Sequence, residues 1–366
     1  MPAQLHLRTA SRRCPKRMVY GPCGGVQADG GCEVPGASCA FLAEPASLAS
    51  LAFDPGDIAP PPGALESGDA LRELPRLAAA DAFAARVRAG GVITTDLPVH
   101  GTDVGVLADA GARLAGLTAV IAGEPPGLRE ALSPTHKSLV LQRAGATVIA
   151  GITCRDRNRV ALEGELAALA DIGVAGILAV TGDHPASTAL PEAEAVFDLD
   201  STRVAALGRR AGLFVAVAEQ PIAPPVAFRP HRLALKARAG AELGILNLCG
   251  NLDAVAAFAA AVAAEGTPIP LLAPIPVITS ARAGARLAAL PAVALPTGLA
   301  ATVSSSRDPL QTGIVAAAEA AHQALSIPGI AGIHLSVIRD DETDPTGLAA
   351  VDAAARTAQL IREAIA

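Results

Sequence analysis

The sequence is poor in aromatic residues, with no tryptophan, one tyrosine and seven phenylalanines among 366 residues. So few rings exclude an aromatic stacking surface of the kind that binds nucleic-acid bases. Charged residues make up only 17%, and the formal net charge is −6. Because phosphate binding depends on clustered lysine and arginine, this balance argues against nucleic acid as a partner. The one basic cluster, Arg12, Arg13, Lys16 and Arg17, is interpreted as a solvated turn.

Long hydrophobic runs are also missing. The longest, over residues 254–264, is ended by Glu265 and is too short to span a bilayer. The N-terminus has basic residues but lacks the apolar stretch of a secretory signal. Six cysteines in such a chain indicate cytosolic thiols or metal ligands rather than a disulfide framework. We therefore expect a cytoplasmic protein with no membrane partner.

Three zones of different composition are present. Residues 1–45 are rich in glycine, cysteine and arginine and show no sustained helical or strand period. Residues 46–78 are rich in alanine, proline and aspartate, and are expected to form a semi-extended connector. Residues 79–366 alternate short β-type runs with longer helical runs.

The third zone contains eight β-then-α units. Strands are expected over 92–96, 115–122, 147–154, 176–181, 213–218, 243–249, 269–274 and 332–338. Helices are expected over 103–112, 158–172, 201–211, from about 230, and over 252–264, 281–290 and 348–366. This rhythm predicts an α/β fold, a (β/α)8 TIM-type barrel that carries a small cysteine-rich N-terminal segment. A doubly wound open sheet is the alternative, but no G-x-G-x-x-G motif follows an early strand.

In such a barrel the functional side chains lie in loops at the C-terminal ends of the strands. An aspartate at such a position also serves as a helix cap, so a single polar residue there carries little weight. Several on one rim indicate a site. The expected rim residues are Asp96, residues 153–157, residues 181–184, Glu219, Gln220, Asn247, Thr279 and Ser280.

Three long stretches resemble the methylenetetrahydrofolate reductases. Residues 152–183, ITCRDRNRVALEGELAALADIGVAGILAVTGD, are similar to the third and fourth βα units of that family. Residues 228–241, FRPHRLALKARAGA, are similar to its flavin-contacting helix. Residues 14–34, CPKRMVYGPCGGVQADGGCEV, resemble the cysteine segment attached to one branch of the family. The resemblance covers nearly the whole chain.

The resemblance implies a flavin, FAD or alternatively FMN, that takes hydride from NAD(P)H. The reduced flavin would convert 5,10-methylenetetrahydrofolate to 5-methyltetrahydrofolate, which would feed one-carbon metabolism and methionine synthesis. Asp96 would be the general acid toward N10 of the folate, Asn247 would read the pterin, and Asp183 would lie beside flavin and folate. The implied flavin contacts are Thr118, Thr153, Gly182, Asp183 and His184, with Arg229, Arg232 and Lys236 toward the pyrophosphate.

Three positions depart from the family pattern. Asp96 replaces a glutamate and Asn247 replaces a glutamine, so each functional group loses about one bond length of reach. A displacement of about 1 Å can lower a rate on the order of a hundredfold. Gly151 stands where the family has a histidine or glutamine that contacts the flavin. These changes bear on flavin binding more than on the fold.

Four cysteines, Cys14, Cys23, Cys32 and Cys39, follow the pattern C-x8-C-x8-C-x6-C. Four thiolates can hold tetrahedral Zn²⁺ or a [4Fe–4S] cluster. The spacing itself leaves metal and free thiols open, whereas the family resemblance favours a metal. Zinc would be a structural clip, and a cluster would imply an electron-transfer protein as partner. The other two cysteines, Cys154 and Cys249, are expected to be buried as small apolar side chains.

Two further functions remain in competition with a flavin-dependent reductase. One is a flavin-free enzyme that binds folate on the same barrel. The other is a non-catalytic subunit that docks a partner through the cysteine segment. A homo-oligomer is compatible with each of them.

Overall fold

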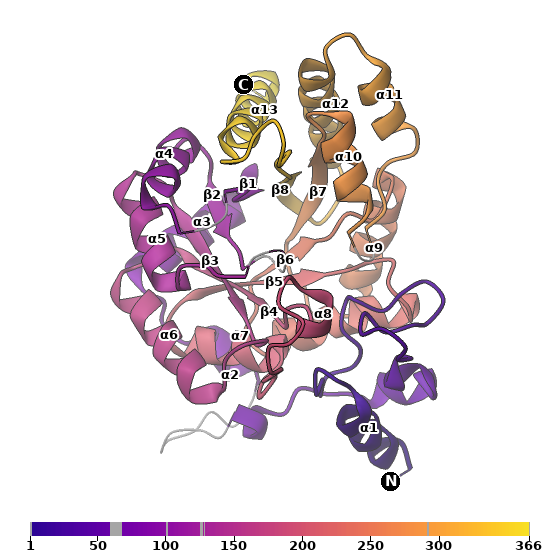
Figure 1. Ribbon diagram of the computed structural model, residues 1–366. Helices are drawn as coiled ribbons and strands as arrows, with labels where there is room; N and C mark the ends of the chain where they lie inside the picture. Colours follow the sequence, from indigo (N-terminus) through magenta and orange to yellow (C-terminus); the bar gives the residue numbers. More distant parts are fainter. Residues whose placement is uncertain are drawn as a thin grey trace.

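The computed structural model describes residues 2–58, 68–99, 102–124, 127, 129–290 and 293–365. Eight parallel strands close into a barrel in sequence order, with β8 pairing with β1 (Figure 1). The predicted (β/α)8 barrel is thus confirmed. The strands are β1 Val92–Asp96, β2 Ala119–Ala122, β3 Val148–Thr153, β4 Gly176–Val180, β5 Phe214–Glu219, β6 Leu243–Leu246, β7 Leu271–Val277 and β8 Ile330–Val337.

Helices surround the barrel, and several begin at a side-chain cap. Asp103, Asn158 and Asp200 each accept a hydrogen bond from a backbone N–H of the following first turn. The predicted helices correspond to α4 Val104–Leu114, α6 Arg159–Asp171, α7 Ser201–Arg210, α8 Arg229–Arg238, α9 Leu252–Ala264, α10 Ala281–Ala288 and α13 Leu348–Ile365.

Several further helices lie outside the predicted set. The expected strand over 115–122 is shorter, because α4 runs to Leu114 and β2 begins only at Ala119. The N-terminal zone, expected to lack a helical period, begins with a helix whose Leu7 and Ala10 are buried. The additional helices are α1 Pro2–Arg13, α2 Gly68–Glu73, α3 Ala78–Ala89, α5 Pro134–Arg143, α11 Leu299–Ser305 and α12 Pro309–Ala324.

The expected connector over 46–78 is packed rather than extended where the structure describes it. It contains the short helices η2 Pro45–Ser50 and η3 Pro55–Ile58 as well as α2. Leu48, Ile58 and Leu71 are buried. Arg209 of α7 donates hydrogen bonds to the backbone carbonyls of Leu74 and Pro75. The three prolines at 60–62 lie outside the described residues.

The inner face of the barrel forms its own hydrophobic cluster. The cluster contains alternate strand residues such as Val92, Ile121 and Phe214, together with one face of α3. Since alternate residues of a strand share a face, these side chains line the lumen, and neighbours such as Ile93 pack under the helices. Phe83 of α3 meets Phe214 edge to face, with ring centroids 4.9 Å apart. Helix α3 therefore closes the N-terminal end of the barrel.

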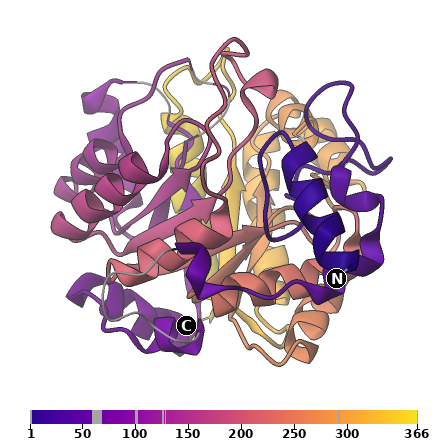
Figure 2. The same cartoon turned by 90° about the horizontal axis from the view of Figure 1, so that it is seen from below.

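The N-terminal segment, residues 2–58, packs against α8. Leu7, Met18, Tyr20 and Phe41 form a cluster with Phe228 and with Leu235 of α8. In Figure 1 this indigo segment lies below α8, and Figure 2 shows α1 beside the barrel from below. The segment is therefore seated on one side of the barrel by an apolar core of its own.

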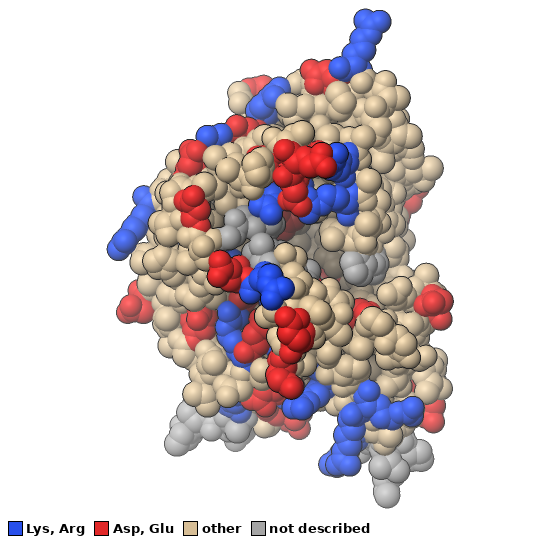
Figure 3. Space-filling model, viewed as in Figure 1, with Lys and Arg blue, Asp and Glu red and all other residues tan. Residues whose placement is uncertain are grey.

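The surface carries charges of both signs. On the face drawn in Figure 3, acidic and basic side chains are interspersed around a central hollow. Within the described residues, no helix is both long and apolar enough to cross a membrane.

We predict opposite effects for two helical glycines. A Cβ on Gly313 of α12 would lie 1.8 Å from the Ile278 carbonyl oxygen, whereas a Cβ on Gly164 of α6 would meet nothing within 4 Å. Alanine normally favours a helix by about 0.5–1 kcal/mol over glycine. Gly164→Ala should therefore raise the free energy of unfolding by up to about 1 kcal/mol. Gly313→Ala should lower it by about 1–3 kcal/mol, as overpacking does.

Urea unfolding of both variants measures these changes. Equal stabilisation by the two alanines would contradict the close approach of α12 to the end of β7.

Candidate functional site

Three of the predicted rim residues face the lumen at the C-terminal mouth of the barrel. Asp96, Thr153 and Asn247 share strand alternation with the lumen residues Val92, Ile149 and Ile245. Asp96 ends β1 with its side chain 47% exposed, and Asn247 is exposed just after β6. Thr153 ends β3 and is buried. The sequence therefore located the mouth correctly at these three positions.

Asp96 has a histidine partner that the sequence reasoning missed. His334 of β8 lies opposite Thr94 in the strand register. Its Nε2 atom is 3.2 Å from the Asp96 carboxylate, and its Nδ1 atom is 2.9 Å from the Thr94 hydroxyl. The ring is 7% exposed. Its only signal in the sequence was a single histidine in the last strand.

Glu124, which follows β2, is a second residue that the sequence analysis missed. It binds Thr153 at the end of β3. The Glu124 carboxylate accepts hydrogen bonds from the backbone N–H and the hydroxyl of Thr153, each at 3.0 Å. Arg157 binds both oxygens of Glu124, at 2.6 and 2.9 Å. Burial raises the pKa of the Glu124 carboxyl group, but Arg157 outweighs burial and the net pKa is lowered.

Gly151 is required by packing at this position of β3. A Cβ on Gly151 would lie 2.7 Å from the Cα atom of Gly123. The two strands therefore approach too closely for the histidine or glutamine expected from the family pattern. A cavity of about 220 Å³ lies farther out on this rim, lined by Glu124, Arg129, Glu130, Ala131, Leu132, Arg155, Asp156, Arg157, Pro185, Thr188, Leu190 and Ala193.

The loop after β4 is held by the N-terminal segment. The Lys16 ammonium donates to the Gly182 carbonyl oxygen at 2.7 Å and pairs with Glu33 at 2.6 Å. Glu33 also accepts from the backbone N–H of His184 at 2.6 Å. The Asp183 carboxylate forms no hydrogen bond or ion pair with the described part of the chain. Asp183 thus keeps its carboxylate available within this loop.

Lys16 corrects the interpretation of the basic cluster as a solvated turn. Arg12, Arg13 and Arg17 are exposed, but Lys16 is only 4% exposed. Burial lowers the pKa of its ammonium group, while Cys23, Glu33 and nearby Asp183 raise it, and the net pKa is raised. Lys16 is therefore a buried charged residue that links the N-terminal segment to the barrel.

His184 turns toward its own loop. Its Nδ1 atom accepts from the backbone N–H of Ala186 at 3.1 Å, and its ring stacks on Phe197 at a centroid distance of 5.8 Å. Burial is the first cause that lowers the pKa of this imidazole. Only the Nε2 atom of His184 has no hydrogen-bond partner in the described chain, so any contact of this side chain with a ligand would be made through Nε2.

Glu219, at the end of β5, lies at the centre of a buried ion-pair cluster. Its carboxylate is 2.8 Å from Arg232, 3.0 Å from Lys236 and 3.5 Å from Arg229. Burial raises the pKa of a carboxyl group, but the three cations outweigh it and lower the pKa of Glu219 to about 2. Burial and the charge of Arg232 lower the pKa of Lys236 to about 8, against the effect of Glu219.

This cluster corrects the expectation that its three cations face a pyrophosphate. Glu219 has the same strand parity as Val215 and Val217, which pack under the helices. Arg229, Arg232 and Lys236 therefore meet it between β5 and α8, where each is at most 3% exposed. Arg229 also donates to the carbonyl oxygens of Ala223, Pro22 and Pro224.

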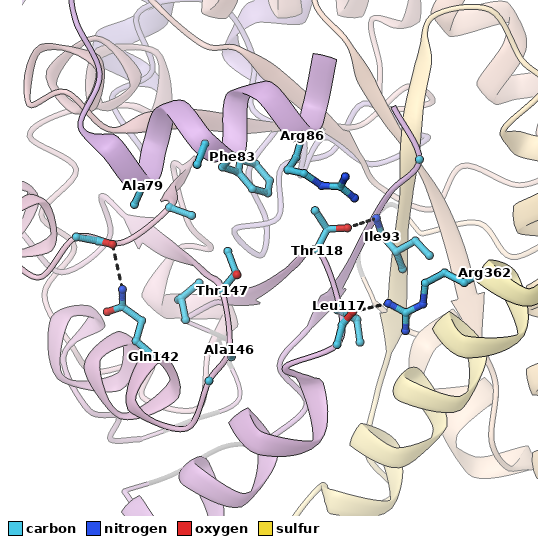
Figure 4. A pocket seen from close by; sticks show the side chains of 17 residues that line it. Ala79, Phe83, Arg86, Ile93, Leu117, Thr118, Gln142, Ala146, Thr147 and Arg362 are labelled. Carbon is cyan, nitrogen blue, oxygen red and sulfur yellow. Dashed lines mark hydrogen bonds between the residues drawn. The ribbon is translucent and has the colours of Figure 1, made fainter. Parts of the chain in front are cut away.

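Thr118 is a further correction, since it lies at the opposite end of the barrel from the mouth. It precedes β2, and its hydroxyl accepts a hydrogen bond from the backbone N–H of Ile93 at 3.0 Å. Figure 4 shows it beside Arg86 of α3 and Arg362 of α13, in a cavity of about 680 Å³. This cavity is lined by the turns that enter β1 to β4, so Thr118 cannot reach a ligand at the mouth.

The four thiols of the cysteine segment, residues 14–39, lie near one another. The pKa of Cys14 is raised to about 11, first by burial and then by the neighbouring Cys23 and Cys32. Burial likewise raises the pKa of Cys32 and Cys39. Among the described residues, however, no three histidine, cysteine or acidic side chains are placed to hold a metal ion. The four thiols therefore lie near one another but do not converge on one point as metal ligands would.

The remaining two cysteines lie in the barrel as expected. Cys154 and Cys249 are buried, and burial raises the pKa of the Cys249 thiol to about 11. Both belong to the main hydrophobic cluster.

We predict that Glu219→Gln lowers the free energy of unfolding by about 3–5 kcal/mol at pH 7, because it leaves buried cations without their anion. Folding lowers the pKa of Glu219 from 4.5 to about 2. The carboxylate contribution is therefore fully present above about pH 4.5 and is lost as the pH falls toward 2. The difference between variant and native chain should shrink over that range.

Urea unfolding at several pH values measures this, with Glu163→Gln as the matched control. Glu163 is 47% exposed and pairs only with Arg159 on the surface of α6, so its loss should cost less than about 0.5 kcal/mol. Equal costs for the two variants at pH 7 would contradict the buried cluster.

One solved structure supports the architecture. A protein from Clostridium thermocellum that binds two copies of 5-methyl-5,6,7,8-tetrahydrofolic acid aligns with a TM-score of 0.56 at 12% identity. The alignment covers 76% of this chain and 98% of that protein. A 2,3-dimethylmalate lyase of the PEP mutase/isocitrate lyase superfamily aligns with a TM-score of 0.41 at 14% identity, over 79% of this chain and 98% of its own. No curated protein matches the chain.

Two family models match the sequence. The one described as "Methylene-tetrahydrofolate reductase C terminal" matches residues 7–52, which include the cysteine segment. The one described as "Methylenetetrahydrofolate reductase" matches residues 116–348, from the turn before β2 to the start of α13. Asp96 lies outside both matches. Because the second match spans more than half of the chain, this protein belongs to the methylenetetrahydrofolate reductase family.

Proposed function

We propose that this chain binds a reduced folate at the C-terminal mouth of the barrel and reduces 5,10-methylenetetrahydrofolate to 5-methyltetrahydrofolate, using NAD(P)H. Family membership over residues 116–348 carries the reaction class. The folate-binding protein from Clostridium thermocellum, which shares the fold, is consistent with folate as the ligand. The mouth supplies suitable polar groups in Asp96, Asp183 and Asn247.

The reaction needs one proton and one hydride. The bond between the methylene carbon and N10 breaks, N10 receives the proton, and the hydride from the nicotinamide adds to the methylene carbon. The Asp96 carboxyl group, half-exposed at the end of β1, is the group that delivers the proton to N10. Positive charge develops on the N5-methylene unit before the hydride arrives.

Asp183 is suited to stabilise that positive charge. Its carboxylate has no hydrogen-bonding partner in the described chain, while its loop is fixed by Lys16 and Glu33. A fixed anion near a developing cation lowers the barrier without a cost of reorganisation. Asn247, exposed at the end of β6, offers an amide that both donates and accepts, as pterin recognition requires.

A flavin as hydride carrier is the second candidate, favoured by the family match. If bound, it would accept hydride from NAD(P)H and pass it to the folate. Five of the eight expected flavin contacts are engaged elsewhere or lie out of reach. Thr153 is bound to Glu124, the three α8 cations are bound to Glu219, and Thr118 lies at the far end. We therefore favour direct transfer from the nicotinamide and assign no step to a flavin.

We also propose that the cysteine segment binds a metal. Four thiols that lie near one another within one short segment support this, and binding would require them to move together around the metal. Zn²⁺ would supply a structural clip, and a [4Fe–4S] cluster would supply an electron path to a partner protein. Either group would need deprotonated thiols. No step of the proposed reaction passes through the metal.

We predict that Asp183→Asn lowers kcat/KM for 5,10-methylenetetrahydrofolate by about 10²–10³-fold, because a neutral amide does not stabilise the cation as a carboxylate does. Folding stability should fall only slightly, since the carboxylate has no hydrogen bond to lose and only a charge attraction to nearby Lys16 is removed. Steady-state NAD(P)H oxidation measures the effect. Asp171→Asn, at the exposed end of α6, is the control and should match the native rate. An active Asp183→Asn enzyme would contradict the role of Asp183.

The visible spectrum of the purified protein separates the two hydride routes. We predict folate-dependent oxidation of NAD(P)H with no flavin bands, and no gain in rate after FAD is added. A yellow protein bleached by NAD(P)H would instead establish the flavin route. Iron–sulfur absorption or zinc detected by elemental analysis would identify the metal, and either should be lost when Cys14 and Cys23 are replaced by serine. A metal-free protein that folds normally would contradict the metal proposal.

A further inference from the structure

His334 is a buried titratable side chain to which the reaction above assigns no role. It lies inside the barrel, because it shares strand parity with Gly332 and Ser336, while Ile333 and Leu335 pack under the helices. Its neighbours in the sheet are Thr94 of β1 and Pro274 of β7. Within β1 and β7, the two strands that flank β8, the single charged side chain is that of Asp96.

Both ring nitrogens of His334 are engaged. Nδ1 lies 2.9 Å from the Thr94 hydroxyl, and Nε2 lies 3.2 Å from the Asp96 carboxylate. The ring is 7% exposed and the carboxylate is 47% exposed. Asp96 is therefore held from below by a buried ring, and only its outer part faces a ligand.

The Thr94 hydroxyl can adapt to either protonation state of the ring. It has a second partner, the Ile333 carbonyl oxygen at 3.4 Å. When the ring is neutral with a proton on Nε2, the hydroxyl donates to Nδ1. When the ring is an imidazolium, Nδ1–H donates to the hydroxyl, which turns its proton to the Ile333 carbonyl. No buried polar group is left unpaired in either state.

We propose that His334 is the positioning residue that orients Asp96 and supplies the proton that Asp96 passes to N10. The proposal rests on the reductase function proposed above. In proton balance, the imidazolium gives its Nε2 proton to one carboxylate oxygen of Asp96. The carboxyl group then protonates N10 as the N10–carbon bond breaks. Asp96 returns to the carboxylate, and the neutral ring regains a proton from solvent through the half-exposed carboxylate.

The arrangement also accounts for the short side chain at position 96. An aspartate has one fewer rotatable bond than a glutamate, so a single Nε2–carboxylate contact is enough to fix its direction. A general acid needs such fixed geometry, because a displacement of about 1 Å can lower a rate on the order of a hundredfold.

Two substitutions separate the two ring contacts. The amide of His334→Gln reaches the position of Nε2 and keeps a donor toward Asp96. The amide of His334→Asn reaches only the position of Nδ1, so it keeps the Thr94 contact and leaves Asp96 unsupported. We expect His334→Asn to lower kcat about a hundredfold with KM for the folate changed less than threefold. His334→Gln should keep the Asp96 orientation and lose only the proton supply, with a smaller fall in kcat.

The same variants in an Asp96→Asn background complete the test. If His334 acts through Asp96, neither variant should lower the residual rate further. A full additional loss in that background, or an unchanged kcat for His334→Asn, would overturn the proposal. Urea unfolding of each variant identifies any loss of rate that comes from unfolding.

A readout without turnover distinguishes this proposal from the reductase function. In ¹⁵N-histidine spectra, the resonance missing from His334→Gln is that of His334. Its Nε2 shift should change in Asp96→Asn. An unchanged shift would overturn the contact itself. A native protein that shows this shift but does not reduce 5,10-methylenetetrahydrofolate would refute the proposed function and leave the contact established.

Discussion

The buried carboxylate of Glu219 is the interaction on which the arrangement of the mouth depends. Three cations surround it, which leaves a buried excess of positive charge between β5 and α8. Removing one partner of such a cluster is costly, so β5 and α8 are held in a single relative position. Arg229 continues the chain of contacts to the Pro22 carbonyl oxygen in the N-terminal segment. That segment in turn holds the loop after β4 through Lys16, and so places Asp183.

Strand positions were predictable because buried parallel strands read as short apolar runs. The alanine-rich α3 and α12 were not, since alanine gives little contrast between a buried and an exposed helix face. At the mouth, the rule that strand ends carry function found Asp96, Asn247 and Thr153. His334 and Glu124 were missed because their roles depend on neighbours in space. The neighbour of His334, Thr94, lies 240 positions away from it in the sequence. The cationic side chains of α8 point toward Glu219 because it lies on the face of β5 that packs against α8. The spacing of residues along α8 does not reveal this.

The cysteine segment illustrates how contacts rather than chain order determine a position. Its family model is described as a C-terminal part of the reductase, yet here it matches residues 7–52, ahead of the barrel. The segment packs against the barrel through an apolar cluster with Phe228 and Leu235. The ion pair between Lys16 and Glu33 adds a contact next to the β4 loop. None of these contacts requires a particular chain connection. Lys16 follows Cys14 closely and Glu33 adjoins Cys32, so the two residues that hold the loop of Asp183 lie next to two of the thiols in the sequence.

The two carboxylates of the mouth differ in the contacts that support them, and this difference is the basis of the roles proposed for them. Asp96 has a ring beneath it that can hold a proton, and its outer face is open. Asp183 has no hydrogen-bonded proton donor in the described chain, and its loop is fixed from the side by Lys16 and Glu33. A reaction that needs one proton at N10 and one fixed negative charge beside a cation is matched by this pair, since two carboxylates in different surroundings take different roles. On the other side of the mouth, Glu124 and Arg157 saturate each other and Gly151 leaves no room for a side chain. The proposed function therefore places substrate recognition on β1, β4 and β6, where the polar groups remain available.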